Sequence, residues 1–326
     1  MLHLRPTLTA ALLALGAVAS VQAQSSVSLY GMVDMSVGQA QAPGAKSTKV
    51  VDSGRMSTSY WGVKGHEDLG GGLSAVFAME AFMLNDTGAS GRFTGDAYFA
   101  RNSFVGLTSN SLGSVKVGRN TTSLFVNTLI FNAFGDSFGF SPAIRHYFIS
   151  GTVSGDTGWN NSVMVASPSM GGLSATATVA AGEGNGGRNT AVSALYFGGP
   201  VGLGFAWQKA KMGATVDDTT SWQLGGSFNF SPVKLYAQYG KVDNDTTGNS
   251  FKITGLGGDF ALGLTSKLML QWGKVKPDLG AGRTTTTFGY DYQMSKRTDV
   301  YVAYMSDRQT GKTSGTAYAV GARHRF

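Results

Sequence analysis

The chain has 326 residues, with 47 glycines, 7 prolines and no cysteine, and its formal net charge is +7 at pH 7. The lack of cysteine excludes disulfides and thiolate metal sites, and a hydrophobic content of 42% argues against disorder. A positive charge suits a nucleic-acid partner, but the sequence has no extended run of basic residues, so no nucleic-acid binding is expected.

The N-terminus has the pattern of a secretory signal peptide. Arg5 precedes an apolar core at 8–18, and small residues ending at Ala23 predict cleavage after that position. The apolar core is shorter than the roughly 18 residues that a membrane anchor needs. We therefore predict a cleaved signal peptide at 1–23 and one mature domain at 24–326.

From residue 26 onward the chain consists of short two-faced segments. In the first of them Val27 and Leu29 alternate with Ser26 and Ser28. This period of two predicts β-strands with one apolar face and one polar face. We count sixteen such segments, and the alternation is weakest at 113–117, 162–166 and 251–261.

Short and long connections alternate between these segments. Tight turns rich in Gly, Pro and Ser are expected at 70–72, 167–172, 198–200, 231–232 and 295–297. Longer polar loops are expected at 38–55, 85–96, 182–189, 209–220, 243–250, 277–283 and 306–314. This order predicts antiparallel strands connected up and down.

The residues of the two faces distinguish a membrane barrel from a soluble sandwich. Charged residues such as Glu80 and Asp291 fall on the polar face, whereas aromatic residues such as Tyr196 and Phe230 lie near the ends of the apolar face. Two-faced segments with aromatic girdles are typical of outer-membrane barrels. The sequence therefore predicts an all-β fold, a 16-stranded antiparallel transmembrane β-barrel, which is wide enough for an aqueous lumen.

One segment, at 118–148, lacks the period of two. Its seven aromatic residues are Phe125, Phe131, Phe134, Phe138, Phe140, Tyr147 and Phe148. Connections above about 12 to 15 residues are usually functional or disordered, and this one is too apolar to be a solvated tail. We expect it to pack inside the barrel.

Four sets of residues carry a resemblance to a known family. They are 25–34 (SSVSLYGMVD); 61–73 (WGVKGHEDLGGGL); 101–107 (RNSFVGL) with 118–120 (GRN); and 295–298 (SKRT) with the terminal 320–326 (VGARHRF). With these motifs the whole mature chain resembles the general porins of Gram-negative bacteria, in the branch typical of betaproteobacteria.

The resemblance implies a general diffusion channel of the outer membrane. Such porins are homotrimers embedded in outer-membrane lipid and lipopolysaccharide, and they let small hydrophilic solutes and ions pass without a cofactor or metal. Their third external loop folds into the lumen as a constriction, a role that falls here to 118–148. Their terminal Phe, here Phe326, resembles the signal that the barrel-assembly machinery reads.

In the resembling porins a ladder of basic residues on the wall faces acids on the inserted loop, and Arg101 matches one position of that ladder. Alternation puts Arg101 on the same face as Ser103 and opposite to Phe104, and we expect that face to point inward. Glu80 on the preceding strand is also expected inward, where it would pair with Arg101. The alternative is a lumen charge that is only solvated.

Two arginines of that ladder are missing, because Tyr60 and Gly158 stand at the matching positions. Lys64 shares the inward face of Tyr60. The remaining candidate pore residues lie on the inserted segment and are Asp136, Arg145 and His146. These substitutions predict a less basic constriction and a weak preference for anions.

Arg119 has two alternative interpretations. In the resembling family this arginine often binds a loop from a neighbouring subunit, and the matching loop here carries Asp86 and Asp96. These three residues are candidates for the subunit interface. A role within one chain is the alternative.

Other classes of function have less support. A barrel enzyme such as a phospholipase or protease would need a base, for which His146 is the one candidate, and an adhesin or receptor would use the external loops. The four histidines lack the spacing of a helical zinc motif. The glycine triplet at 70–72 lacks the Lys-Ser/Thr of a phosphate-binding loop and is expected to be a turn.

Overall fold

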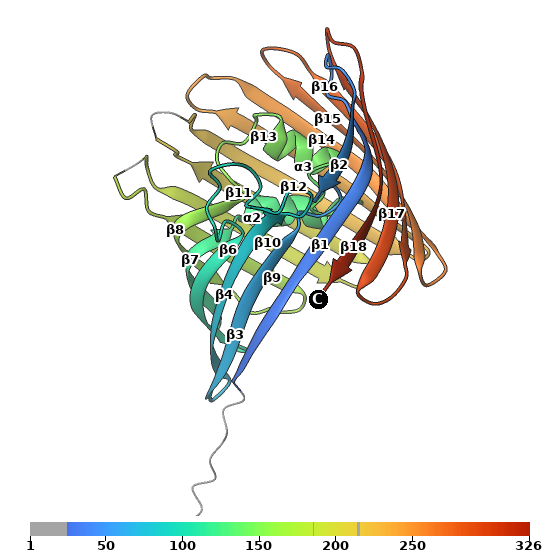
Figure 1. Cartoon of the computed structure of the whole chain (residues 1–326). Coiled ribbons are helices and arrows are strands. Elements are labelled where there is room, and N and C mark those ends of the chain that lie inside the picture. Colours follow the sequence, from blue (N-terminus) through green and yellow to red (C-terminus); the bar gives the residue numbers. More distant parts are fainter. Residues whose placement is uncertain (1–24, 185, 214–215) are drawn as a thin grey trace, which may run out of the picture.

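A computed structural model describes residues 25–184, 186–213 and 216–326, so the signal peptide predicted at 1–23 lies outside the described residues. The described chain is a ring of antiparallel strands with long loops at one end and short turns at the other (Figure 1). Its strands are β1 (Ser26–Ala40), β2 (Thr48–Ser53), β3 (Tyr60–Gly70), β4 (Leu73–Leu84), β5 (Ala89–Ser90), β6 (Asn102–Ser109), β7 (Gly113–Thr121), β8 (Gly158–Ala166), β9 (Leu173–Ala180), β10 (Asn189–Gly198), β11 (Val201–Ala210), β12 (Thr219–Phe230), β13 (Val233–Asn244), β14 (Ser250–Leu262), β15 (Ser266–Pro277), β16 (Arg283–Gln293), β17 (Thr298–Gln309) and β18 (Gly315–Arg325).

The first strand closes the ring. One edge of β1 pairs with β18, and its other edge pairs with β2 and β3, which lie end to end as two parts of one barrel strand. The short β5 pairs with β4 within a loop. The eighteen strands of the sheet therefore form a closed barrel of sixteen, which confirms the predicted fold.

The apolar face of this barrel points outward. Val27 is 70% exposed and Leu270 is 54% exposed, whereas Gln223 and Gln271 on the opposite face are fully buried. A soluble sandwich would bury the apolar face and expose the polar one. The reversed arrangement is that of a barrel in lipid, where every backbone group must find its partner within the sheet.

The turns lie where the sequence predicts them, but one expected loop is wrong. At 38–55 the strand β1 continues to Ala40, and Thr48, Val50 and Val51 belong to β2. These β-branched residues favour a strand, and they pair with the end of β1. Only 41–47 is a loop, and a second irregular segment, 54–59, separates β2 from β3.

The long insertion also begins and ends later than the sequence predicts. Residues 118–121 belong to β7, because they pair with β6 and β8, so the insertion comprises 122–157. It contains the helix α2 (Ser123–Ile130), the short helix α3 (Pro142–Ile144) and the π-helical turn η1 (Arg145–Ile149). No helix among residues 25–184, 186–213 and 216–326 is long and apolar enough to cross a membrane.

Side-chain caps start both helices of the insertion. The Thr122 side chain accepts a hydrogen bond from the Phe125 N–H, and the Ser141 side chain accepts one from the Ile144 N–H. Such caps satisfy backbone donors that the first helical turn leaves free. Pro142 suits its place at the start of α3, because its ring presets the helical φ angle.

The insertion lies against the polar face of the sheet. Asn127 and Thr128 of α2 hydrogen bond to the Gln223 side chain of β12, and the Ala133 N–H donates to the Gln271 side chain of β15. Figure 1 shows α2 and α3, in green, within the ring of strands. The polar wall residues thus supply partners for the backbone and side chains of a mainly apolar segment.

Glycines in the wall make room for the aromatic residues of the insertion. A Cβ atom at Gly225 would lie 2.3 Å from the Phe131 ring, and one at Gly204 would lie 2.4 Å from it. At Gly226, which faces the other side of β12, a Cβ would have its nearest neighbour 3.8 Å away. The contact between wall and insertion therefore depends on glycine at selected inward positions.

The variant Gly225→Ala tests this packing. It should lower the free energy of unfolding by about 1–3 kcal/mol, because the new methyl group overpacks against Phe131. The matched variant Gly226→Ala changes the same residue type on the outward face and should leave stability within about 0.5 kcal/mol. Urea unfolding of the refolded protein in lipid vesicles measures both, and equal effects of the two variants would contradict the account.

Candidate functional site

Three adjoining cavities follow the wall that runs from β1 to β10. The loop-side cavity, of about 400 Å³, lies between Arg101 on the wall and Phe138 on the insertion. The middle cavity has about 250 Å³ and the turn-side cavity about 460 Å³. Neighbouring cavities share lining residues, which are Thr121 and Val126 at the first junction and Asn102, Phe104 and Lys116 at the second. Together they trace a path from the long-loop end to the short-turn end.

A belt of polar side chains crosses the wall between the loop-side and turn-side cavities, with Glu80 at its centre. One Glu80 oxygen accepts from the Tyr30 hydroxyl at 2.6 Å and lies 2.6 Å from an Arg101 guanidinium nitrogen; the other accepts from the Asn102 amide at 2.6 Å. Asn102 in turn accepts from the Thr121 N–H and hydroxyl. The predicted pair of Glu80 and Arg101 thus exists as part of a larger network, in which the carboxylate has three donors.

Arg101 points inward as predicted, but the reason given for it was wrong, because the prediction placed Ser103 on the inward face and Phe104 on the outward face. Ser103 shares its face with Val105, which is 61% exposed and faces outward, whereas Phe104 lines the turn-side cavity. Arg101 nevertheless reaches the lumen, because β6 begins only at Asn102 and the preceding bend releases Arg101 from the strand pattern. Its side chain can therefore turn inward to Glu80.

Tyr60 and Lys64 lie on the same wall. The Arg101 guanidinium carbon lies 4.0 Å from the centroid of the Tyr60 ring, and the Lys64 ammonium lies 4.7 Å from that of Tyr30. The rings of Tyr30 and Tyr60 meet edge to face, with centroids 6.2 Å apart. Aromatic faces attract cations. Tyr60, which stands where the family pattern suggests a second arginine, therefore stabilises the side chain of Arg101.

The other departure from the family pattern, Gly158, also has a structural reason. A Cβ atom there would lie 3.3 Å from the guanidinium of Arg119, which donates to the Gly158 carbonyl at 3.2 Å. Arg119 thus lies against the position where the resemblance suggests an arginine. A larger residue at 158 would displace it.

The insertion faces this wall with aromatic residues and one acid. Phe125 and Phe138 stack with ring centroids 5.9 Å apart, and both line the loop-side cavity with Asp136. The Asp136 carboxylate accepts from the Ser57 hydroxyl at 3.0 Å. The insertion's surface toward the path is therefore mainly apolar, and the Asp136 carboxylate on it is already hydrogen-bonded to Ser57.

The irregular segment 54–59, which we call the inner turn, holds the tip of the insertion. The Arg55 carbonyl accepts from the Gly139 N–H at 3.1 Å and from the Ser137 hydroxyl at 2.8 Å. The inner turn is itself anchored by Asp34, whose carboxylate accepts from the N–H groups of Met56 and Ser57. Sequence reasoning missed this contact because it ended the expected external loop at residue 55, within the inner turn.

Arg145 and His146 do not line the path, contrary to the sequence-based prediction. Arg145 lies beside Asp307, with N···O at 3.4 Å, and Arg283 pairs with the same carboxylate. His146 is fully buried, and its Nε2 lies 2.9 Å from the Thr285 hydroxyl. Burial and the charge of Arg283 lower the pKa of His146 to about 3, so the ring is neutral at physiological pH. Instead, His146 binds the insertion to β16 through Thr285, and Arg145 binds it to β17 through Asp307.

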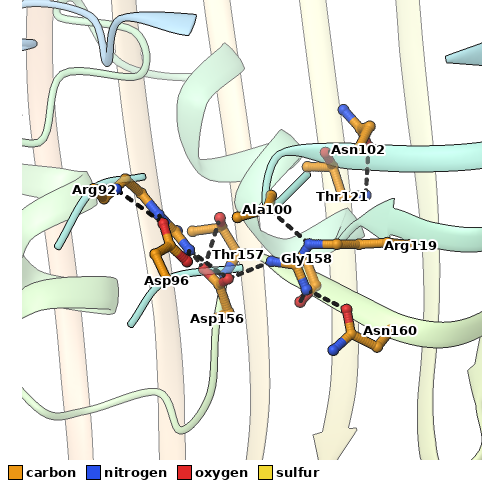
Figure 2. Close-up of polar contacts among 10 residues, drawn as sticks. All are labelled: Arg92, Asp96, Ala100, Asn102, Arg119, Thr121, Asp156, Thr157, Gly158 and Asn160. Carbon is orange, nitrogen blue, oxygen red and sulfur yellow. Dashed lines mark hydrogen bonds and ion pairs between the residues drawn. The ribbon is translucent and has the colours of Figure 1, made fainter. Parts of the chain in front are cut away.

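Arg119 is part of a charged cluster near the end of the insertion (Figure 2). It forms an ion pair with Asp156 and donates to the Ala100 carbonyl at 2.6 Å. Arg92 bridges Asp156 and Asp96, with N···O distances of 2.6 Å and 2.8 Å. Arg119 therefore reaches Asp96 only through Asp156 and Arg92.

This arrangement matches the alternative in which Arg119 acts within one chain. Asp86, the other acid predicted at a subunit interface, is exposed in the same loop as Asp96. A contact of this loop with a neighbouring subunit stays a prediction.

Lys116 is a wall residue that sequence reasoning missed. It lines the turn-side and middle cavities, and its ammonium lies 4.6 Å from the centroid of the Phe104 ring. Its inward direction could have been predicted from the sequence, because Val115 and Val117 on either side are the outward pair.

Comparisons with known proteins agree with this architecture. The family model described as Gram-negative porin matches residues 9–312. Outer membrane porin protein 32 of Delftia acidovorans is 30% identical over 97% of this chain and 98% of its own, and an outer membrane porin protein of Bordetella pertussis is 27% identical over 99% and 100%.

Solved structures are similar over nearly the whole chain. An anion-selective porin from Comamonas acidovorans matches with a TM-score of 0.80 and 24% identity, over 93% of this chain and all of that one. The outer membrane protein OmpT of Vibrio cholerae, in its trimer form, matches with a TM-score of 0.70 and 14% identity, over 93% and 99%.

The charged cluster should make the stability of the end of the insertion depend on pH. Burial alone would raise the pKa of Asp156, but the hydrogen bonds and charges of Arg92 and Arg119 outweigh it and lower that pKa. A folded pKa below the unfolded value of about 3.9 means that this stabilisation is complete above about pH 4 and is lost as the pH falls through the folded pKa.

Hydrogen exchange of the amides around Thr157, corrected for intrinsic rates, measures this pH dependence. Protection should stay constant from pH 7 to about pH 4 and decrease below it. In Asp156→Asn the protection should be low at every pH, whereas Asp86→Asn, at the exposed acid of the neighbouring loop, should behave like the unmodified chain. A loss of protection already at pH 6 would show that another group controls this contact.

Proposed function

The chain belongs to the Gram-negative porin family, and we propose that small hydrophilic solutes and ions diffuse passively through its lumen, across the outer membrane. The observation that carries this proposal is the series of three cavities along the wall from β1 to β10, in which neighbouring cavities share lining residues. A sixteen-stranded barrel is wide enough for water.

The insertion is proposed to act as the constriction. It reaches from β7 to the far wall at β16, and the inner turn holds its tip, so solutes pass between Arg101 on one side and the Phe125 and Phe138 pair on the other. A passage with one charged wall and one apolar wall admits small hydrated solutes and excludes larger ones by size.

A weak preference for anions is proposed from the charges along the path. Arg101, Lys116 and Lys64 follow one another on the wall, and the acids near them, Glu80 and Asp136, already accept hydrogen bonds from protein donors. These three basic residues outnumber the two acids, and a net positive charge along a pore favours anions. The similar porin from Comamonas acidovorans is described as anion-selective, which supports the same direction here.

The assembly is proposed to be a homotrimer, surrounded by outer-membrane lipid and lipopolysaccharide and inserted by the barrel-assembly machinery. The similar barrel of Vibrio cholerae OmpT exists in a trimer form. Phe326, the proposed assembly signal, lies at the seam of the barrel, where its N–H donates to the Gly31 carbonyl at 3.1 Å. An enzymatic role is not proposed, because the candidate base His146 is buried between the insertion and β16.

Planar lipid bilayers test the proposed channel. Purified protein should raise the conductance of the membrane in discrete steps, grouped in threes if the trimer forms, because each barrel contributes one passage. Bilayers that stay sealed despite folded, inserted protein would refute the channel.

The pair of Arg101 and Glu80 should set the size of the anion preference. In a salt gradient, Arg101→Gln should lower the ratio of chloride to potassium permeability about twofold or more, since a unit charge beside a confined path changes ion energies by about 1 kcal/mol. Glu80→Gln should raise that ratio, because it leaves Arg101 uncompensated.

The double variant Glu80→Gln, Arg101→Gln is the matched control, because it removes both charges together. Its reversal potential should lie between those of the single variants. If neither single substitution changes the reversal potential, the residues that select between ions lie elsewhere along the path.

A further inference from the structure

The turn-side cavity contains two lysines whose charges are not matched. Lys64 of β3 and Lys116 of β7 both line this cavity of about 460 Å³. Within the described ranges 25–184, 186–213 and 216–326, no carboxylate lies within ion-pair distance of either ammonium. Other inward lysines differ: Lys234, for example, lies directly opposite Asp259 on the neighbouring strand.

Aromatic rings hold both ammonium groups beside the cavity. Lys64 lies over Tyr30 and Lys116 over Phe104, at 4.7 Å and 4.6 Å from the ring centroids. A ring face attracts the cation but does not cancel its charge. Each ammonium therefore keeps hydrogen-bond donors for a solute while its long side chain is restrained.

The acid in the same cavity is already engaged. Glu80 accepts from Tyr30 and Asn102 and pairs with Arg101, so three donors converge on its carboxylate. The remaining polar groups of the cavity are mainly hydroxyls, which are those of Ser26, Ser28, Thr108 and Ser114. The cavity thus combines neutral donors with two ammonium groups that form no ion pair within the described part of the chain, a composition that suits a solute with more than one negative charge.

The spacing of the two lysines indicates the shape of that solute. Their strands are separated by β4 and β6, so the two backbones lie roughly 14 Å apart along the wall at about 4.8 Å per strand. The two ammonium groups lie over different rings, those of Tyr30 and Phe104, so the charges occupy two separate positions. A linear molecule with a charge at each end matches this arrangement better than a compact ion.

We propose that the turn-side cavity is a solute subsite for small dicarboxylates, with one carboxylate near Lys64 and the other near Lys116. This proposal rests on the proposed channel function and adds a preferred class of solute to it. A dicarboxylate that leaves the constriction would pause here before it leaves through the short-turn end. The two-point contact lengthens that pause relative to a monocarboxylate of equal length.

Succinate and butyrate test the proposal, because both have four carbons and they differ in one carboxylate. Chloride current through single channels in planar bilayers, at low salt, should decrease in a saturable way as succinate is added. Butyrate at the same concentrations should have little effect. Lys64→Gln and Lys116→Gln should each raise the half-blocking succinate concentration about fivefold, the upper range for one exposed ion pair, and raising the salt should weaken the block.

Lys234→Gln is the matched control, since it removes an inward lysine that also lies over a tyrosine, Tyr236, but does not line this cavity. It should leave the block by succinate unchanged. Equal block by succinate and butyrate, or equal loss of block in all three lysine variants, would overturn the subsite. A failure of the channel function is distinguishable, because then no chloride current would exist to be blocked.

Discussion

The pairing of β1 on both edges is the constraint on which the rest of the structure depends. Through β18 on one side and β2 with β3 on the other, it turns an open sheet into a ring without free edges. Lipid offers no hydrogen bonds, so only such a ring lets a sheet cross a membrane. Closure also fixes the meaning of the two faces: the apolar side chains contact lipid, and the polar ones are gathered in the lumen.

That polar interior determines where the insertion lies. Gln223, Gln238 and Gln271 of the wall hydrogen bond to it, and wall glycines leave space for its aromatic rings. All these contacts come from β11 to β16, so the insertion covers one side of the lumen. The open path remains along the opposite side, beside the belt around Glu80. One asymmetric placement thus produces both the narrowing and the row of basic residues that a solute passes.

Sequence patterns predicted the barrel, its sixteen strands and the position of the insertion, because period-two alternation and loop length are local properties of the chain. The same patterns failed where a side chain leaves its strand or meets distant residues. Arg101 lies in a bend just before β6, so alternation gave the wrong face for its neighbours. The inner turn at 54–59 extends beyond the loop predicted at 38–55 and was not recognised. His146 is buried because of contacts with β15 and β16, which no local pattern records.

We propose that solutes pass along the β1 to β10 side of the lumen while the insertion fills the side formed by β11 to β16. Because the chain has no cysteine, single cysteines can report accessibility without background. A charged thiol reagent added to open channels should reduce the current of Thr108→Cys, which lines the turn-side cavity, and leave Thr287→Cys, fully buried in β16, unchanged. Equal reaction at both positions, or reaction at residue 287 alone, would contradict this placement of the path.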